Sequence, residues 1–330
     1  GEAYLWPALC SSALALLSLL LSCRAGRRTL WIMSLYLLLG VMSFCSAAIA
    51  GRPRSFSPEL TSEALRRFSS LIDEAGFASE STGALLKALL TGDRSSLGYE
   101  TVEIFRKSGA SHILALSGLH LGIIYGILTK VLSAFGNTRP VKIAGSIVII
   151  VVSAFYVVMT GASPSIIRAF LFICINELFS FAPGRRRSPL TAFCAALLIQ
   201  LSFNPAAVLS VGFQLSYLAM FGILKIYPYL RRFYPSGRRG GVMPLLWNSM
   251  SLSVSCQLFT APLVWACFKS FPPFFLITNL ISLPLVELLM VCAVFCLCCE
   301  ALFICPEFMK NLCDALAQAL LYSLEVIASL

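Results

Sequence analysis

The residues best suited to chemistry lie in one stretch, residues 108–126. Both histidines of the 330-residue chain are there, His112 and His120, and Ser117 precedes His120 by one helical turn. A serine and a histidine at this spacing could serve as nucleophile and base, as in an intramembrane hydrolase. No carboxylate in the stretch would orient the imidazole and no oxyanion motif is evident, so we expect no catalytic residue. Polar groups in an apolar helix instead indicate a bundle interior or a water-filled path.

Glycines in the same stretch predict how its helix packs. Gly118, Gly122 and Gly126 recur every four residues and form a face of small residues that lets helices approach closely. At about 100° per residue, Ser117, His112 and His120 fall on a different arc. We therefore expect the helix to pack through its glycines and to present polar groups elsewhere.

A cation stands near the start of a later apolar run. Ser163 is a helix-capping residue type, Pro164 suits a first helical turn, and Arg168 follows one turn further in. The start of a helix favours anions. Arg168 either extends outward to the membrane surface or faces an aqueous path.

Two more apolar runs contain polar residues, Gln214 and Ser216 in one and Asn279 in the other. Pro284 follows Asn279 and removes a backbone donor, which favours a broken helix of the kind that lines substrate paths. The alternative is that these side chains only bond neighbouring helices together.

Residues 91–97 and the cysteines have simpler interpretations. Asp93, Ser95 and Gly92 suit a turn that caps a helix, and no Gly-Lys-Ser/Thr sequence follows, so we expect no nucleotide-driven motor. Cysteines cluster at residues 292–299 within an apolar run that lacks His and Asp. Packing or lipid contact is the expected role, with no metal and no cofactor.

These groups must be positioned by helices in a membrane. The chain is 58% hydrophobic and 12% charged, with a mean hydropathy of +0.86, which excludes a soluble enzyme over most of its length. We predict an all-α polytopic membrane protein with about nine transmembrane or re-entrant helices plus short amphipathic surface helices. The expected spans are residues 7–22, 30–50, 113–135, 143–160, 165–181, 189–203, 206–227, 242–268 and 274–304.

Charge sets the expected orientation. The formal charge is +10, and the basic clusters fall in alternate loops, on the cytoplasmic side by the positive-inside rule. They are either such anchors or contacts for anionic lipid. The predicted organisation is a transmembrane hairpin at 1–50, an extracytoplasmic amphipathic helical segment at 51–110, a transmembrane core at 111–305, and a C-terminal amphipathic helix at 306–330. Within 51–110, helices are expected at 60–75, 84–90 and 98–108, with Glu63–Arg67 and Glu103–Lys107 ion pairs.

Five pieces together resemble the competence domain of the ComEC-type DNA-uptake proteins. They occur in the family's order and cover roughly residues 60–300. The pieces are LLTGDRSSL at 89–97, FRKSGASHILALSGLHLG at 105–122, GASPSIIRA at 161–169, NP at 204–205 with GFQLSY at 212–217, and NLISLP at 279–284.

The resemblance implies a multi-pass protein of the bacterial inner membrane through which single-stranded DNA enters the cytoplasm during natural transformation. It implies membrane lipid, a periplasmic DNA receptor and a cytoplasmic helicase-like ATPase as partners, and a homodimer is a further expectation. The candidates for the DNA path or the family motifs are Asp93, Arg94, Ser95, Arg106, Ser108, His112, Ser117, His120, Ser163, Pro164, Arg168, Gln214, Ser216 and Asn279.

Two departures bear on activity. Many relatives carry an OB-like domain before this core and a metallo-β-lactamase-like nuclease domain after it. Such a nuclease domain needs several His and Asp ligands. This chain has two histidines, both within residues 108–126, so we expect no nuclease within it. The alternatives are a transporter of another anionic or lipid-like solute, or a membrane scaffold for a separate DNA-processing partner.

Overall fold

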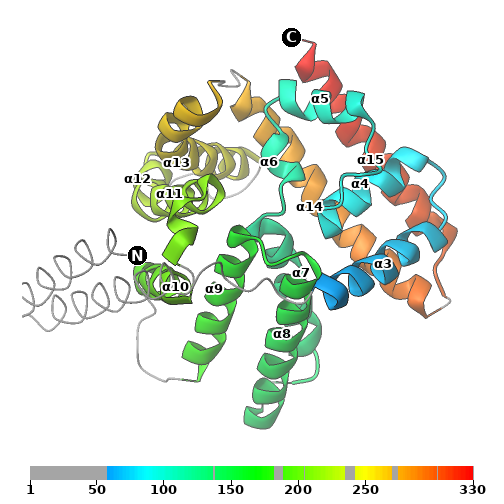
Figure 1. Cartoon of the computed structure of the whole chain (residues 1–330), viewed down its shortest axis with the longest axis horizontal. Coiled ribbons are helices and arrows are strands. Elements are labelled where there is room, and N and C mark those ends of the chain that lie inside the picture. Colours follow the sequence, from blue (N-terminus) through cyan, green and yellow to red (C-terminus); the bar gives the residue numbers. More distant parts are fainter. Residues whose placement is uncertain are drawn as a thin grey trace, which may run out of the picture. The chain divides into compact units, whose positions relative to one another are not determined.

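The computed structural model describes residues 58–136, 138–181, 189–203, 205–234, 242–269, 274–302 and 304–329, and all regular elements in them are helices (Figure 1). The predicted hairpin at 1–50 lies outside the described residues. In chain order the helices are α3 Pro58–Glu74, α4 Glu80–Thr91, α5 Tyr99–Lys107, α6 Ser111–Leu114, α7 Gly118–Ser133, α8 Arg139–Met159, α9 Pro164–Ser180, α10 Pro189–Phe203, the 3-10 helix η2 Pro205–Leu209, α11 Val211–Lys225, α12 Tyr227–Arg232, α13 Val242–Phe268, α14 Phe275–Ala301 and α15 Glu307–Ala328.

Three described helices are long and apolar enough to cross a membrane: Arg139–Met159, Leu246–Phe268 and Phe275–Ala301. Two shorter helices, Gly118–Ser133 and Pro189–Ser202, are also apolar. The all-helical prediction is confirmed for the described part of the chain, and the count of nine spans stays a prediction.

Local sequence sets several helix ends. Pro164 and Pro189 open α9 and α10, where the missing N–H costs no helical hydrogen bond. Gly92 ends α4 with a positive φ of 81°, and its N–H bonds the carbonyl of Ala88. Glycine adopts this left-handed backbone without strain.

Two predicted spans are interrupted in the structure. Residues 113–135 divide into α6 and α7, because the backbone of Ser117 is extended (φ −120°, ψ 167°) and a new helix starts there. Residues 206–227 divide into η2, α11 and α12. By contrast, α14 continues through Pro284, so the predicted break at this proline is wrong. A helix tolerates a proline where its surroundings satisfy the freed carbonyl.

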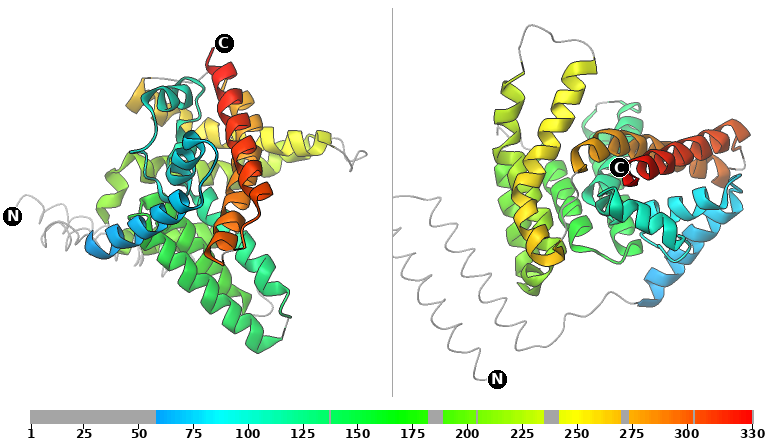
Figure 2. Two further views of the ribbon diagram at one scale, coloured as in Figure 1. Left: turned by 90° about the vertical axis from the view of Figure 1, so that its right-hand side faces the viewer. Right: turned by 90° about the horizontal axis from the view of Figure 1, so that it is seen from above.

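The chain forms two compact units, residues 1–55 with 174–214 and residues 56–173 with 215–330. The second, the larger unit, holds the main core, to which α3 to α6, α14 and α15 contribute. Figures 1 and 2 show α14 and α15 side by side within it. The side of α15 that enters this core carries Cys313, Ala317, Leu320 and Leu324, at the three- and four-residue spacing of one helix face.

The predicted helices of residues 51–110 are present as α3, α4 and α5, but they pack into this core. Leu85, Leu86 and Leu89 of α4 are fully buried. Burying a leucine stabilises a fold by roughly 1.5–3 kcal/mol, so α4 is firmly held. The side of the membrane on which this segment lies stays a prediction.

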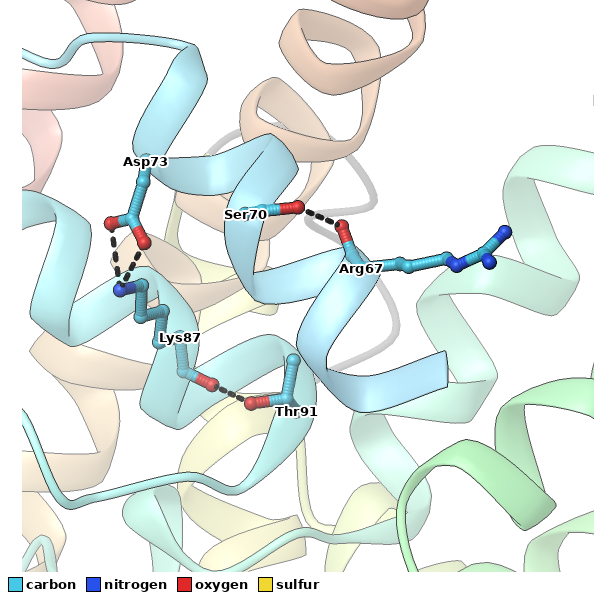
Figure 3. Close-up of polar contacts among 5 residues, drawn as sticks. All are labelled: Arg67, Ser70, Asp73, Lys87 and Thr91. Atoms are coloured by element: carbon cyan, nitrogen blue, oxygen red, sulfur yellow. Dashed lines mark hydrogen bonds and ion pairs between the residues drawn. The ribbon is translucent and has the colours of Figure 1, made fainter. Parts of the chain in front are cut away.

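Figure 3 shows polar contacts within and between α3 and α4. Lys87 of α4 forms an ion pair with Asp73 of α3 at 2.7 Å, and Thr91 Oγ1 donates to the carbonyl of Lys87 at 2.6 Å. The Ser70 hydroxyl donates to the carbonyl of Arg67, within α3.

One of the two predicted ion pairs of this segment is confirmed. Arg67 contacts Glu63 at 2.9 Å. Glu103 pairs with Arg106 at 2.7 Å, so its predicted pairing with Lys107 is wrong. The arginine fork reaches both carboxylate oxygens of Glu103 from three residues away, a geometry that a lysine cannot offer.

Candidate functional site

The turn after α4 is held by hydrogen bonds to its own residues and to α6. The guanidinium of Arg94 donates from Nε (3.2 Å) and Nη2 (2.7 Å) to the carbonyl of Leu114, the last residue of α6. Asp93 Oδ1 accepts the N–H of Ser95 at 2.9 Å. Hydrogen bonds from the Ser95 side chain and backbone hold the pKa of Asp93 below its ordinary value. Asp93, Arg94 and Ser95 therefore stabilise a turn.

This turn packs against the break between α6 and α7. A Cβ added at Gly92 would clash with the side chain of Leu116, so only glycine fits there. The hydroxyl of Tyr156 in α8 donates to the carbonyl of Leu90 at 2.9 Å. The Gly92–Leu116 approach and the Arg94–Leu114 bonds place this turn beside the break between α6 and α7, and Tyr156 ties the end of α4 to α8.

Ser117 and His120 form a capping box at that start. His120 Nδ1 accepts the backbone N–H of Ser117 at 2.9 Å, and Ser117 Oγ accepts the N–H of Leu119 at 3.2 Å. Because Nδ1 is the acceptor, we assign the proton of a neutral imidazole to Nε2. Ser117 Oγ also lies 3.2 Å from Nδ1, and the contacts of the two side chains with the backbone are those of a helix cap.

Arg106, Ser108 and His112 lie at the ends of α5 and α6. His112 Nδ1 lies 3.1 Å from the carbonyl oxygen of Gly109. Ser108 is buried, and its carbonyl accepts the Thr278 hydroxyl of α14 at 2.6 Å. The Thr278 contact links the end of α5 to α14, whereas the Arg106–Glu103 and His112–Gly109 contacts are local.

The three glycines of α7 differ in their surroundings. A Cβ added at Gly118 would lie 3.3 Å from the Cβ of Ala169 in α9, so α7 and α9 approach closely there. An added Cβ at Gly122 or Gly126 would have no atom within 4 Å. Helix packing through Gly122 and Gly126 stays a prediction.

Arg168 is the most unusual buried residue of the larger unit. Only 7% of it is exposed, so its side chain does not reach outward to the surface of that unit. Its Nη2 donates to Ser165 Oγ at 3.3 Å, and Ser165 Oγ lies 3.2 Å from Ser216 Oγ of α11. The guanidinium carbon lies 5.3 Å from the ring centroid of Tyr217, within the range of a cation–π contact.

Sequence reasoning singled out Arg168 and Ser216 as site residues and named the helix start at 163–165 beside Arg168, but it gave neither Ser165 nor Tyr217 as a site residue. Both missed residues lie inside the quoted pieces GASPSIIRA and GFQLSY. Ser165 was also recognisable as the residue one turn before Arg168. No local signal pairs residue 165 with residue 216 or residue 168 with residue 217, because the two pieces lie about fifty residues apart.

The comparisons with known proteins identify the family of this chain. A family model described as "Competence protein" matches residues 89–330. The chain belongs to the competence-protein family. It is 37% identical over 145 residues to ComE operon protein 3 of Bacillus subtilis, a match that covers 44% of this chain and 18% of that protein.

Two further relatives of this competence-family chain match more of its length. Recombination protein 2 of Haemophilus influenzae is 29% identical over 220 residues, covering 63% of this chain and 27% of the relative. Competence protein ComA of Neisseria gonorrhoeae is 29% identical over 229 residues, covering 64% and 30%. The matched region is thus less than a third of each of these three relatives. No solved structure matches the chain.

Within this competence-family chain, polar atoms without partners concentrate at the predicted site residues. In the described residues, five buried side-chain atoms have no hydrogen-bond partner: His120 Nε2, Ser153 Oγ, Ser163 Oγ, Arg168 Nη1 and Asn279 Oδ1. Four of the five belong to the residues singled out from the sequence. Buried polar groups are normally satisfied, so each exception needs an explanation. The predicted cap by the Ser163 side chain does not form.

Gln214 belongs to the unit of residues 174–214, apart from the other candidates. Its Nε2 donates to the carbonyl of Val208 at 2.8 Å, which ties the start of α11 to η2.

Among the residues that the structure describes, no three His, Cys, Asp or Glu side chains form a metal-binding group. The sulfur atoms of Cys292 and Cys313, and of Cys296 and Cys305, lie 3.3 Å apart.

Proposed function

We propose that this chain is the inner-membrane part of a path by which single-stranded DNA enters the cytoplasm during natural transformation. Membership of the competence family supports this proposal. Its partners would be a periplasmic DNA receptor and a cytoplasmic helicase-like ATPase, and two copies of the chain could act together. The division into a hairpin, an extracytoplasmic segment, a core and a C-terminal helix belongs to the same proposal.

The observation that carries the proposal is the buried cation Arg168, which forms no ion pair among the described residues, together with three more polar atoms at motif residues that have no partner there. Burying a charge or a polar group without a partner is costly, so such groups in membrane proteins usually serve a function. A nucleic acid strand needs positive charge or dipoles for its phosphates and tolerates aromatic walls for its bases. Arg168 beside Tyr217 offers both.

Exposed apolar stripes support the placement in a membrane. On α8, Ile143, Ile147, Val151 and Phe155 recur every four residues and are each more than 40% exposed. On α14, Ile277, Ile281 and Leu288 are also exposed. A contiguous apolar face of this kind fits the hydrocarbon of a bilayer.

Entry of labelled transforming DNA into the cytoplasm tests the proposal. A deletion strain of a competent host should lose entry, and the wild-type gene should restore it. Arg168→Ala and Asn279→Leu should fail to restore entry at normal membrane levels. Ser153→Ala is the matched control, because Ser153 also has an unpartnered buried hydroxyl but lies outside the motifs, and it should restore entry.

Unchanged DNA entry in the deletion strain would contradict the proposal. In that case the same Arg168→Ala strain would be assayed for uptake of small anions.

A further inference from the structure

We propose that Arg168, Ser165, Ser216 and Tyr217 form a binding site for one phosphodiester group of a single-stranded nucleic acid. The inference rests on the proposed function and deepens it, because it names the group that is bound and the side chains that bind it. All four residues belong to the larger unit.

The first argument is an uncompensated charge. Four ion pairs are recorded among the described residues, and none includes Arg168. The recorded contacts of its guanidinium are the Ser165 hydroxyl and the Tyr217 ring, both neutral. Arginine is almost never buried without a partner, and an unpaired buried charge is strongly unfavourable. An anion at this position would remove that penalty.

The second argument is that the guanidinium is already oriented. The bond from Nη2 to Ser165 Oγ holds it over the first turn of α9, and the Ser165–Ser216 contact fixes that turn to α11. Tyr217 lies against the guanidinium. Within the described part of the chain, Nη1 is buried and has no hydrogen-bond partner, so its N–H groups are not committed to another acceptor.

The third argument is the position at the start of α9. The helix begins at Pro164, and Ser163 just before it has an unpartnered buried hydroxyl. Backbone N–H groups of a first turn carry the partial positive charge of the helix dipole. Arg168 and the Ser163 hydroxyl therefore belong to a helix start whose dipole also favours an anion.

The single positive charge of the site indicates which kind of anion it binds. One cation with neutral hydroxyl groups matches a single negative charge, and each phosphodiester of a nucleic acid carries one. A phosphate monoester carries about −1.5 to −2 at neutral pH and would call for a second cation. The aromatic ring beside the cation suits a strand whose bases are unpaired and free to stack. A lipid headgroup also contains a phosphodiester, and the experiment must separate the two sources.

The test measures binding of a fluorescent thymidine oligonucleotide to the purified full chain in detergent, at several salt concentrations. Arg168→Gln should weaken binding roughly tenfold or more, as expected for a lost charged hydrogen bond. It should also reduce the slope of log affinity against log salt by about 0.7, the value for one phosphate contact on a single strand. The matched control is Arg67→Gln, which removes an exposed arginine on α3 and should change neither quantity.

A second set of binding measurements identifies which chemical group of the oligonucleotide the site binds. An oligonucleotide with an uncharged methylphosphonate backbone should bind the wild-type chain weakly, and Arg168→Gln should cause no further loss. Tyr217→Phe keeps the ring and should bind like the wild type, whereas Tyr217→Leu should bind more weakly. If Arg168→Gln does not fold, the Ser165→Ala and Ser216→Ala variants should show a smaller loss in the same direction.

The outcomes separate the inference from the proposed function. No binding of any oligonucleotide by the folded chain would count against the proposed function itself. Tight binding with the same affinity and salt slope in Arg168→Gln would overturn the inference and leave the proposed function standing. If glycerophosphoglycerol, the headgroup of an anionic lipid, binds through Arg168 and the oligonucleotide does not, the site takes lipid and the inference is wrong.

Discussion

Two regions of the larger unit bury polar side chains in opposite ways. In the docked region, formed by α4, α5, α14 and α15, Asp314 is 6% exposed and accepts the N–H groups of Ala78 (2.9 Å) and Ser79 (3.3 Å). Thr278 donates to the carbonyl of Ser108. In the polar region, formed by the first turns of α7 and α9 with Ser216 and Tyr217, the buried atoms His120 Nε2 and Arg168 Nη1 have no hydrogen-bond partner among the residues that the structure describes.

The difference distinguishes two roles of buried polar side chains, one in stability and one in function. A satisfied buried group holds elements together, and its loss should lower stability. An unsatisfied one costs stability already, so its loss should alter function more than fold. The two kinds of buried polar group are neighbours in α14. Among the described residues, Asn279 Oδ1 has no hydrogen-bond partner, whereas the hydroxyl of the preceding residue, Thr278, donates to the carbonyl of Ser108.

The largest expected effect on stability is that of Asp314→Ala. The substitution leaves two backbone N–H groups without their charged acceptor, which should lower the free energy of unfolding by about 3 kcal/mol. Thermal unfolding of the purified chain in detergent measures the change. Glu325→Ala, an exposed position on the same helix, is the control. Equal melting temperatures for both variants would show that the α3–α4 turn is not held by Asp314.

Thr278→Val should have the next largest effect. Valine preserves the shape but leaves the carbonyl of Ser108 without its donor, at a cost of about 1–2 kcal/mol. Thr129→Val is the matched control, since Thr129 is exposed and donates only within its own helix. A Thr278 variant as stable as the control would remove the distinction drawn between the two regions.

His120→Gln should separate stability from function. Glutamine at the third position of a helix can replace His120 as acceptor for the Ser117 N–H, so the free energy of unfolding should change by less than about 0.5 kcal/mol. Entry of transforming DNA should nevertheless fall, because the unpartnered Nε2 is lost. Normal DNA entry with normal stability would assign His120 to the cap alone.

The smallest expected effect concerns pH. The pKa of Asp93 is held below its ordinary value of 3.8 by Ser95, so its ionised form contributes stability above pH 3.8. That contribution is lost as the pH falls through the lowered pKa. Asp93→Asn keeps a side-chain acceptor for the turn but cannot titrate, so its stability should fall less steeply in acid than that of the wild type. Parallel acid profiles of the two proteins would show that Asp93 does not contribute.

Helix ends show where sequence reasoning succeeded and where it failed. Residues 189–203 and 242–268 were predicted with the bounds that the structure has, because proline, glycine and loss of hydropathy are local signals. The split at Ser117 was missed because residues 113–135 form one long and mainly apolar run, in which Ser117 and His120 were interpreted as polar groups within a helix. The capping box and the bond from Arg94 to Leu114 make that break stable, and both depend on folded geometry.

By itself the sequence determined the helical class, the apolar composition and the family motifs, since these follow from residue types and short spacings. Only the tertiary structure decided which polar residues are satisfied. The Asp314 contact joins residues 236 positions apart in the chain, and the Ser165–Ser216 contact joins residues 51 positions apart. Pairing over such separations is set by how helices pack against one another. That packing gives Asp314 two backbone donors and, within the described part of the chain, leaves Arg168 buried with Nη1 unpartnered.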